Sequence, residues 1–115
     1  MDHHPNANDI DRRLKLDREL RGLLQDTLDC GRVYYQPPEN VRMQYPAIVY
    51  KQNTMNVRYA NDRSYYIRDE YQVIAISDDP ESPLPRAIQE HFSLCAPGRK
   101  YMADNLYHFP FTIYY

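Results

Sequence analysis

A stripe of leucines near the N-terminus constrains the fold more than any other feature of the chain. Between residues 9 and 29, apolar side chains recur at the three- and four-residue spacing of an α-helix. On a helical wheel of 100° per residue they fall within an arc of about 140°; they are Leu16, Leu20, Leu23, Leu24 and Leu28, with Thr27 between them. A stripe this wide predicts a helix over residues 9–29 that packs against a sheet.

Residues that favour helix ends flank this segment. Asn8 or Asp9 is placed to cap the N-terminus with its side-chain oxygen. Gly31 stands where a glycine in the left-handed conformation commonly follows the last helical residues. The sequence therefore predicts that the helix begins next to Asn8 and ends before Gly31.

Two apolar residues of the same segment, Ile10 and Leu14, lie at or beyond the edge of the stripe. Asp17 and Arg21 share that side and are spaced to form an ion pair one helical turn apart. Because Ile10 and Leu14 lie off the main apolar face, they indicate a second contact surface on the helix.

The rest of the chain carries strand signals, turns and one short helix. Strands are predicted at residues 33–35, 47–51 and 65–77, and in a closing hairpin of residues 99–103 and 107–115 turned at Asp104–Asn105. The apolar residues of 47–51 are consecutive, as in an inner strand covered on both faces. Ser82 and Pro83 open a short helix as cap and first helical residue. Its apolar face comprises Leu84, Ala87, Ile88 and His91 or Phe92.

Alternation assigns faces to the two longest strands. In one strand, Ile67, Tyr71, Val73 and Ala75 point the same way. In the last strand, one face holds Tyr107, Phe109, Phe111, Ile113 and Tyr115. Pro110 has no backbone N–H, so the last strand is predicted to be an edge strand or to be bulged at that residue.

Residues 52–64 form a polar segment between two strand signals. Within it, Met55, Val57 and Tyr59 alternate with polar residues. This pattern predicts an extended hairpin arm with its tip near Asn61–Asp62.

The order helix, strands, helix, strands predicts an α+β fold. We expect a single mostly antiparallel sheet flanked by two helices on one side, with the extended hairpin arm. A chain of 115 residues suits one domain. Residues 9–115 are predicted to form it, after a flexible N-terminal arm of residues 1–8.

Charge and composition exclude several classes of function. The net charge of −2 gives no general basic footprint for nucleic acid or an anionic membrane. No run approaches the roughly 18 apolar residues of a membrane span, and the N-terminus lacks the pattern of a signal peptide. We therefore expect a cytoplasmic protein without a membrane partner. The two cysteines, Cys30 and Cys95, are expected to be reduced.

No catalytic, metal or cofactor site is predicted. Cys30 follows a helix C-terminus, where the helix dipole disfavours a thiolate. Cys95 lies four residues after His91, but Pro97–Gly98 interrupts any helix that would pair them. The four histidines show no convergent ligand spacing, and the three glycines are isolated, so neither a metal cluster nor a phosphate loop is indicated. We therefore expect a protein that is not an enzyme.

Nucleic-acid binding remains an alternative. The arm mixes cations with aromatic rings, as single-strand binders do: Arg58, Tyr59, Arg63, Tyr65, Tyr66 and Arg68. Acidic residues interleave with them, which is typical of salt-bridged faces or protein contacts. A small module that binds single-stranded nucleic acid through the arm is the second hypothesis.

Short motifs across the chain resemble a protein family. They are the run Tyr35–Val41, the run Tyr45–Tyr50, Tyr71–Val73 leading to Asp79–Pro80, and Tyr101–His108 with the aromatic last strand. Together they are similar to small virion proteins of long-tailed bacteriophages, called tail terminator, tail completion or head-tail joining proteins. The resemblance covers roughly residues 20–115.

The resemblance implies a structural protein of the virion that acts without a cofactor. It implies an α+β subunit that assembles with copies of itself as a ring, commonly hexameric, at the end of the tail tube. Its partners would be the tail tube protein and a head connector or adaptor, and double-stranded DNA would pass through the ring unread. Such a protein would assemble in the host cytoplasm and reside in the virion tail or neck.

A ring requires surfaces that meet other subunits. The chain has 12 tyrosines and no tryptophan, and tyrosine suits both strands and interfaces. We expect the interface to use the helix edge and the arm. The predicted residues are Ile10, Leu14, Met55, Val57, Arg58, Tyr59, Asp62, Arg63, Tyr65 and Tyr66.

Overall fold

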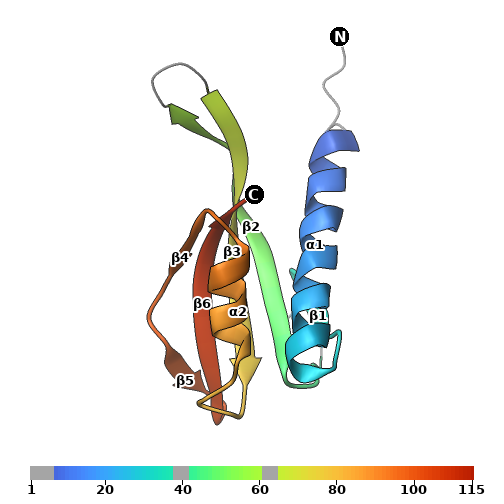
Figure 1. Ribbon diagram of the computed structural model, residues 1–115, viewed down its shortest axis with the longest axis vertical. Helices are drawn as coiled ribbons and strands as arrows, with labels where there is room; N and C mark the ends of the chain where they lie inside the picture. The colour runs from blue at the N-terminus through green and yellow to red at the C-terminus, as the bar shows by residue number, and fades with distance from the viewer. Residues whose placement is uncertain (1–6, 38–41, 61–64) are drawn as a thin grey trace.

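The structure is a computed structural model that describes residues 7–37, 42–60 and 65–115; residues 7–11 and 54–68 are described by their backbone alone. In these ranges the chain forms two helices and six strands (Figure 1). In chain order they are α1 (Ala7–Leu28), β1 (Val33–Tyr35), β2 (Ala47–Ala60), β3 (Tyr65–Ser77), α2 (Leu84–His91), β4 (Cys95–Pro97), β5 (Tyr101–Ala103) and β6 (Leu106–Tyr114).

The strands form one sheet in the order β1-β2-β3-β6-β4, and β5 also pairs with β6. The β1–β2 pair is parallel, whereas the other pairs are antiparallel. Together with the two helices, this confirms the predicted α+β fold with a single, mostly antiparallel sheet.

Both helices pack on the same face of the sheet, where they enclose the core (Figure 1). Leu16, Leu20 and Leu24 of α1 have no exposed surface, and Leu84 and Ile88 of α2 are equally buried. The sheet contributes Ile48, Tyr50, Tyr71, Val73, Ala75, Phe111 and Ile113. The leucine stripe is therefore confirmed, as are the inner face of β3 from Tyr71 to Ala75 and that of β6 from Phe109 to Ile113.

The helix ends differ from the sequence prediction. α1 begins at Ala7, before both Asn8 and Asp9, so two residues of the predicted N-terminal arm are helical and residues 1–6 lie outside the described part. At the other end the left-handed residue is Asp29 (φ 54°), not Gly31. Aspartate tolerates this conformation better than most residues, and the Gln25 amide stabilises it by donating to the Asp29 carboxylate at 2.6 Å.

The second helix and the last hairpin turn are present where the sequence predicted them, with the helix shifted by one residue. α2 begins at Leu84, one residue later than predicted, so Pro83 and not Ser82 occupies the cap position. The Ser82 hydroxyl still accepts the Leu84 N–H at 3.3 Å. Asp104 and Asn105 both have positive φ, 53° and 62°, and join β5 to β6 in a tight turn. Two successive left-handed residues are the signature of a type I′ hairpin turn, and Asp and Asn favour it.

From Pro110 the sequence predicted that the last strand is an edge strand or is bulged, and the prediction of an edge strand is wrong. β6 is not an edge strand, because β3 pairs along one side and β4 and β5 along the other. The Pro110 carbonyl accepts the Gly98 N–H at 2.8 Å, so its ring nitrogen faces the same side, in the break between β4 and β5. The missing donor therefore interrupts no strand pairing.

β2 and β3 continue beyond the sheet as a two-stranded ribbon, defined here as residues 54–60 paired with 65–70 (Figure 1). Irregular register between Gln52 and Val57 marks its root. The predicted hairpin arm is thus confirmed as two strands, while its predicted tip near Asn61–Asp62 lies outside the described residues.

Candidate interaction surfaces

The ribbon is the first candidate surface because its backbone is paired on one side of each strand only. β1 pairs with β2 up to Tyr50, and β6 pairs with β3 down to Glu70. Just beyond, Asp69 and Tyr115 exchange both backbone hydrogen bonds, at 3.0 and 3.3 Å. Past these points neither strand has an outer partner among the described residues, so the ribbon presents two rows of unpaired N–H and C=O groups.

Buried polar groups lie at the root of the ribbon. Asp69 and Tyr71 of β3 are completely buried. Burial, reinforced by the nearby Asp69 carboxyl, raises the pKa of Tyr71 to about 12. Asp69 is one of the acidic residues that interleave with the cations of the arm, and its complete burial shows that the arm is anchored in the core at this point.

A tyrosine and an aspartate fix α1 to the β1–β2 edge of the sheet. The Tyr50 hydroxyl donates to the Asp17 carboxylate at 2.6 Å and accepts from the Arg13 guanidinium at 3.2 Å. The same guanidinium lies 4.3 Å from the centre of the Tyr35 ring, within reach of a cation–π interaction. Burial and the bond to Asp17 raise the pKa of Tyr50 well above its ordinary value.

The predicted Asp17–Arg21 ion pair is present, and it does more than join two turns of the helix. Arg21 Nε donates to Asp17 at 2.5 Å, and its two other nitrogens donate to the carbonyls of Gly31 and Val33 at 2.8 and 3.0 Å. Arg21 therefore occupies the outer edge of β1.

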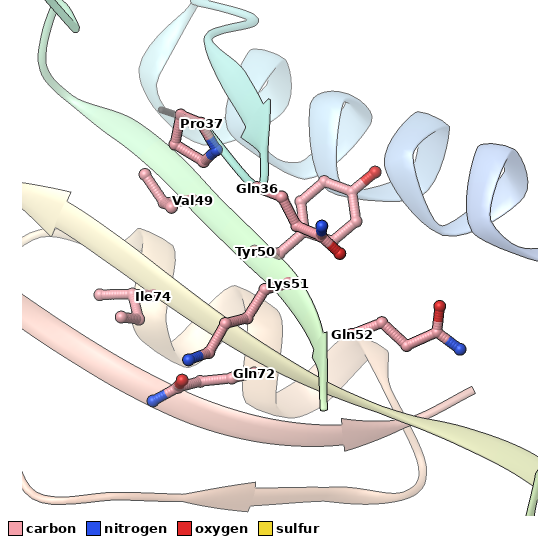
Figure 2. A pocket seen from close by; sticks show the side chains of 8 residues that line it. All are labelled: Gln36, Pro37, Val49, Tyr50, Lys51, Gln52, Gln72 and Ile74. Atoms are coloured by element: carbon pink, nitrogen blue, oxygen red, sulfur yellow. The ribbon is translucent and has the colours of Figure 1, made fainter. Parts of the chain in front are cut away.

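A groove on the helix-free face of the sheet is the second candidate surface. It has a volume of about 520 Å³ and is lined by Gln36, Pro37, Val49, Tyr50, Lys51, Gln52, Gln72 and Ile74. Figure 2 shows Val49, Lys51, Gln72 and Ile74 on the side of β2 and β3 away from α1, and Tyr50 turned towards the helix. The lining combines the apolar side chains of Pro37, Val49 and Ile74 with the polar side chains of Gln36, Lys51, Gln52 and Gln72.

This groove also corrects an expectation for β2. The apolar run at residues 47–51 predicted a strand covered on both faces, yet Val49 is half-buried and Lys51 is exposed. Neither of the two described helices covers this face. The run of apolar residues reflects a central strand whose second face is only partly covered.

The seam between the two helices is the third candidate surface. Here Glu19 of α1 bonds His91 of α2 at 3.0 Å, and the Tyr115 hydroxyl donates to the other Glu19 oxygen. Burial by itself would raise the pKa of Glu19, but the hydrogen bonds from Tyr115 and His91 and the charge of Lys15 outweigh it and lower that pKa. These groups lie in a groove of about 390 Å³.

The seam does not assemble a nucleophilic site. Glu19 uses both oxygens to hold His91 and Tyr115, and the hydrogen bond of His91 goes to Glu19. Cys95 lies in β4 rather than on the helix, and burial raises the pKa of its thiol, which disfavours the reactive thiolate. Cys95 and Cys30 are both free thiols. Among the described residues no group of His, Cys, Asp and Glu is arranged to hold a metal ion.

The predicted interface residues fall into three groups. Leu14 is exposed over 44% of its surface, as expected for a residue off the packed stripe. Asp62 and Arg63 lie outside the described residues. The structure places the backbone, but not the side chains, of Ile10, Met55, Val57, Arg58, Tyr59, Tyr65 and Tyr66. Sequence reasoning missed the Asp17–Tyr50 and Glu19–His91 contacts. The two residues of each pair are far apart in the chain, by 33 and 72 positions, so no local sequence pattern links them.

The comparisons add no family to this geometry. The sequence matches no known protein-family model, and no curated protein is significantly similar to it. Within the described part of the chain, no helix has the length and apolar character needed to span a membrane.

Proposed function

We propose that this protein is a structural subunit of a long-tailed bacteriophage virion, which forms a ring that terminates the tail tube and joins the tail to the head. The observation that carries the proposal is the projecting ribbon with two unpaired outer edges. A two-stranded ribbon is marginally stable by itself in water, so neighbouring subunits are needed to complete it. The sequence resemblance over roughly residues 20–115 favours the same class of protein.

The proposal names three protein partners: other copies of the chain, the tail tube protein, and a head connector or adaptor. Double-stranded DNA passes through the ring. A net charge of −2 suits this passage, because binding along the duplex is rewarded by counterion release from basic surfaces. The protein would assemble in the host cytoplasm and remain in the virion neck.

Besides the arm, α1 carries basic residues that would add to a nucleic-acid surface, namely Arg12, Arg13, Lys15, Arg18 and Arg21, and internal contacts occupy at least two of them. Arg13 is bound to the Tyr50 hydroxyl. Arg21 is bound to Asp17 and to two backbone carbonyls. This favours a structural subunit over a module that binds single-stranded nucleic acid. The proposal assigns the protein no catalytic step.

The test is assembly of the purified protein. We expect light scattering to give several times the 13.8 kDa monomer mass, and electron microscopy to show rings alone or at the ends of tubes formed by the tail tube protein of the same phage. A permanent monomer that binds neither tubes nor connector would contradict the proposal. Strongly salt-dependent binding to single strands in a gel-shift assay would favour the alternative.

A further inference from the structure

We call the sheet outside the ribbon, together with the two helices, the body of the protein. The outer edges of its sheet are protected against further strand pairing. On one side β1 is three residues long, and the Arg21 guanidinium donates hydrogen bonds to the outward-facing carbonyls of Gly31 and Val33. On the other side β4 is also three residues long and ends at Pro97, which has no backbone N–H. Short strands, a covering side chain and an edge proline are the devices that prevent unwanted edge-to-edge association.

Two of these devices, short strands and an edge proline, are missing from the ribbon. It is longer than either edge strand of the body, and residues 54–60 and 65–70 contain no proline. No strand of the described residues pairs with either outer edge. The same chain therefore closes its edges in one place and leaves two open in another.

The register shows which backbone groups are open. Asp69 exchanges hydrogen bonds with Tyr115, so by alternation Ile67 and Tyr65 direct their N–H and C=O groups to that same outer side. Their partners across the ribbon, Arg58 and Ala60, form the non-bonded pairs and direct their groups outward from β2. Arg68 and Val57 face one another inside the ribbon.

We propose that the ribbon joins neighbouring copies of this chain head to tail, with the outer edge of β3 in one copy paired to the outer edge of β2 in the next. This inference rests on the proposed ring. All subunits of a ring have the same orientation, and β2 and β3 run in opposite directions. When ribbons stand side by side around the ring, each β3 therefore meets the following β2 in antiparallel register. Closure leaves no edge unpaired, as in a barrel.

A second copy fits both edges, whereas a single foreign strand fits one. An extended peptide added to β2 would leave the β3 edge open, and the reverse holds for β3. Two copies paired β2 to β2 about a twofold axis would also leave both β3 edges open. The head-to-tail contact uses one edge of each kind at every interface, so it satisfies the whole ribbon with one type of contact.

Edge prolines test the pairing. Ile67→Pro removes an outward N–H from β3, and Arg58→Pro removes one from β2; neither N–H has a partner strand within the described subunit. We expect each variant to be monomeric by light scattering and to keep the near-wild-type thermal unfolding midpoint. The matched control, Ile67→Val, keeps the backbone donor and the β-branched side chain, and should assemble as wild type does.

Mixing the two proline variants makes the test specific. Ile67→Pro retains an intact β2 edge and Arg58→Pro an intact β3 edge, so an equimolar mixture should form a heterodimer that grows no further. A dimer of Ile67→Pro alone would show twofold β2 pairing and overturn the proposal. A mixture that stays monomeric while the wild type assembles would overturn it as well.

Hydrogen exchange gives a readout without mutation. In the wild-type oligomer, in solution or on tubes, the amides of Ile67 and Arg58 should exchange at least about tenfold more slowly than in the monomeric variants, because each gains a hydrogen bond. The Arg68 amide faces β2 and should change little. Rings in which the Ile67 amide exchanges freely would refute the edge pairing and leave the proposed ring intact. Failure of the wild type to assemble at all would refute both.

Discussion

The body and the ribbon share two strands but are built on opposite rules. In the body, β2 and β3 lie between other strands, α1 and α2 cover one face, and Arg21 occupies the outer edge of β1. In the ribbon, the same strands have lost their outer neighbours. The comparison teaches that edge protection in this chain is local and selective. A strand edge left open beside edges that are closed indicates a contact surface.

The largest effect is expected from a cavity in the body. Leu20→Ala removes a side chain with no exposed surface and should lower the free energy of unfolding by about 2–5 kcal/mol, measured by urea denaturation. Because the ribbon depends on its root, its amides should lose protection in the same transition. Leu14→Ala, on the same helix but at an exposed position, should stay within about 0.5 kcal/mol of wild type. Ribbon amides that stay protected at urea concentrations where the body has unfolded would show that the ribbon does not depend on its root.

A smaller effect is expected when one edge of the body is opened, as the edges of the ribbon already are. Arg21→Ala removes the hydrogen bonds to Gly31 and Val33 and opens the β1 edge, at an expected loss of about 1 kcal/mol, since Arg21 is half-exposed. The opened edge should also raise concentration-dependent self-association, measured by light scattering. Arg18→Ala, an exposed neighbour on α1, is the control and should change neither quantity. Equal association of both variants would show that Arg21 does not protect the edge.

A third substitution strengthens the body while leaving the ribbon as it is. Gly22 lies on α1, and a Cβ atom added there meets no atom within 4 Å. Gly22→Ala should therefore stabilise the protein by up to about 1 kcal/mol through helix propensity, seen as a higher thermal unfolding midpoint. Local exchange of the ribbon amides should not change. A lower midpoint would mean that this helix face requires the glycine.

The smallest effect concerns acid stability at the helix seam. The pKa of Glu19 is lowered in the folded protein from its ordinary value of 4.5, so its carboxylate stabilises the fold above that pH. This contribution is lost as the pH falls through the folded pKa. Glu19→Gln should flatten the decline of stability between about pH 5 and pH 3 by less than about 1 kcal/mol. An unchanged slope in urea titrations would argue against the Glu19 contacts.

Local signals were enough to predict most of the fold. The leucine stripe gives the buried face of α1, and Asp104–Asn105 gives the last hairpin, because helical spacing and left-handed turns are decided within a few residues. The left-handed end of α1 was misassigned to Gly31, since side-chain contacts from Gln25 stabilise Asp29 there. The partners of Asp17 and Glu19 could not be predicted, because they depend on which strands become neighbours.

The irregular register at the root of the ribbon also carries a rule of length. Between Gln52 and Val57, five steps along β2 accompany three along β3. Thr54 lies opposite Glu70 within this segment, so β2 holds two residues more than β3, and each irregularity accommodates one of them as a β-bulge does. Removing one of these residues would remove one irregularity and leave Val57 opposite Arg68 and Arg58 opposite Ile67, so the inner and outer amides of the ribbon would keep their directions. The segment can therefore lose one or two residues without altering what it offers to a neighbour.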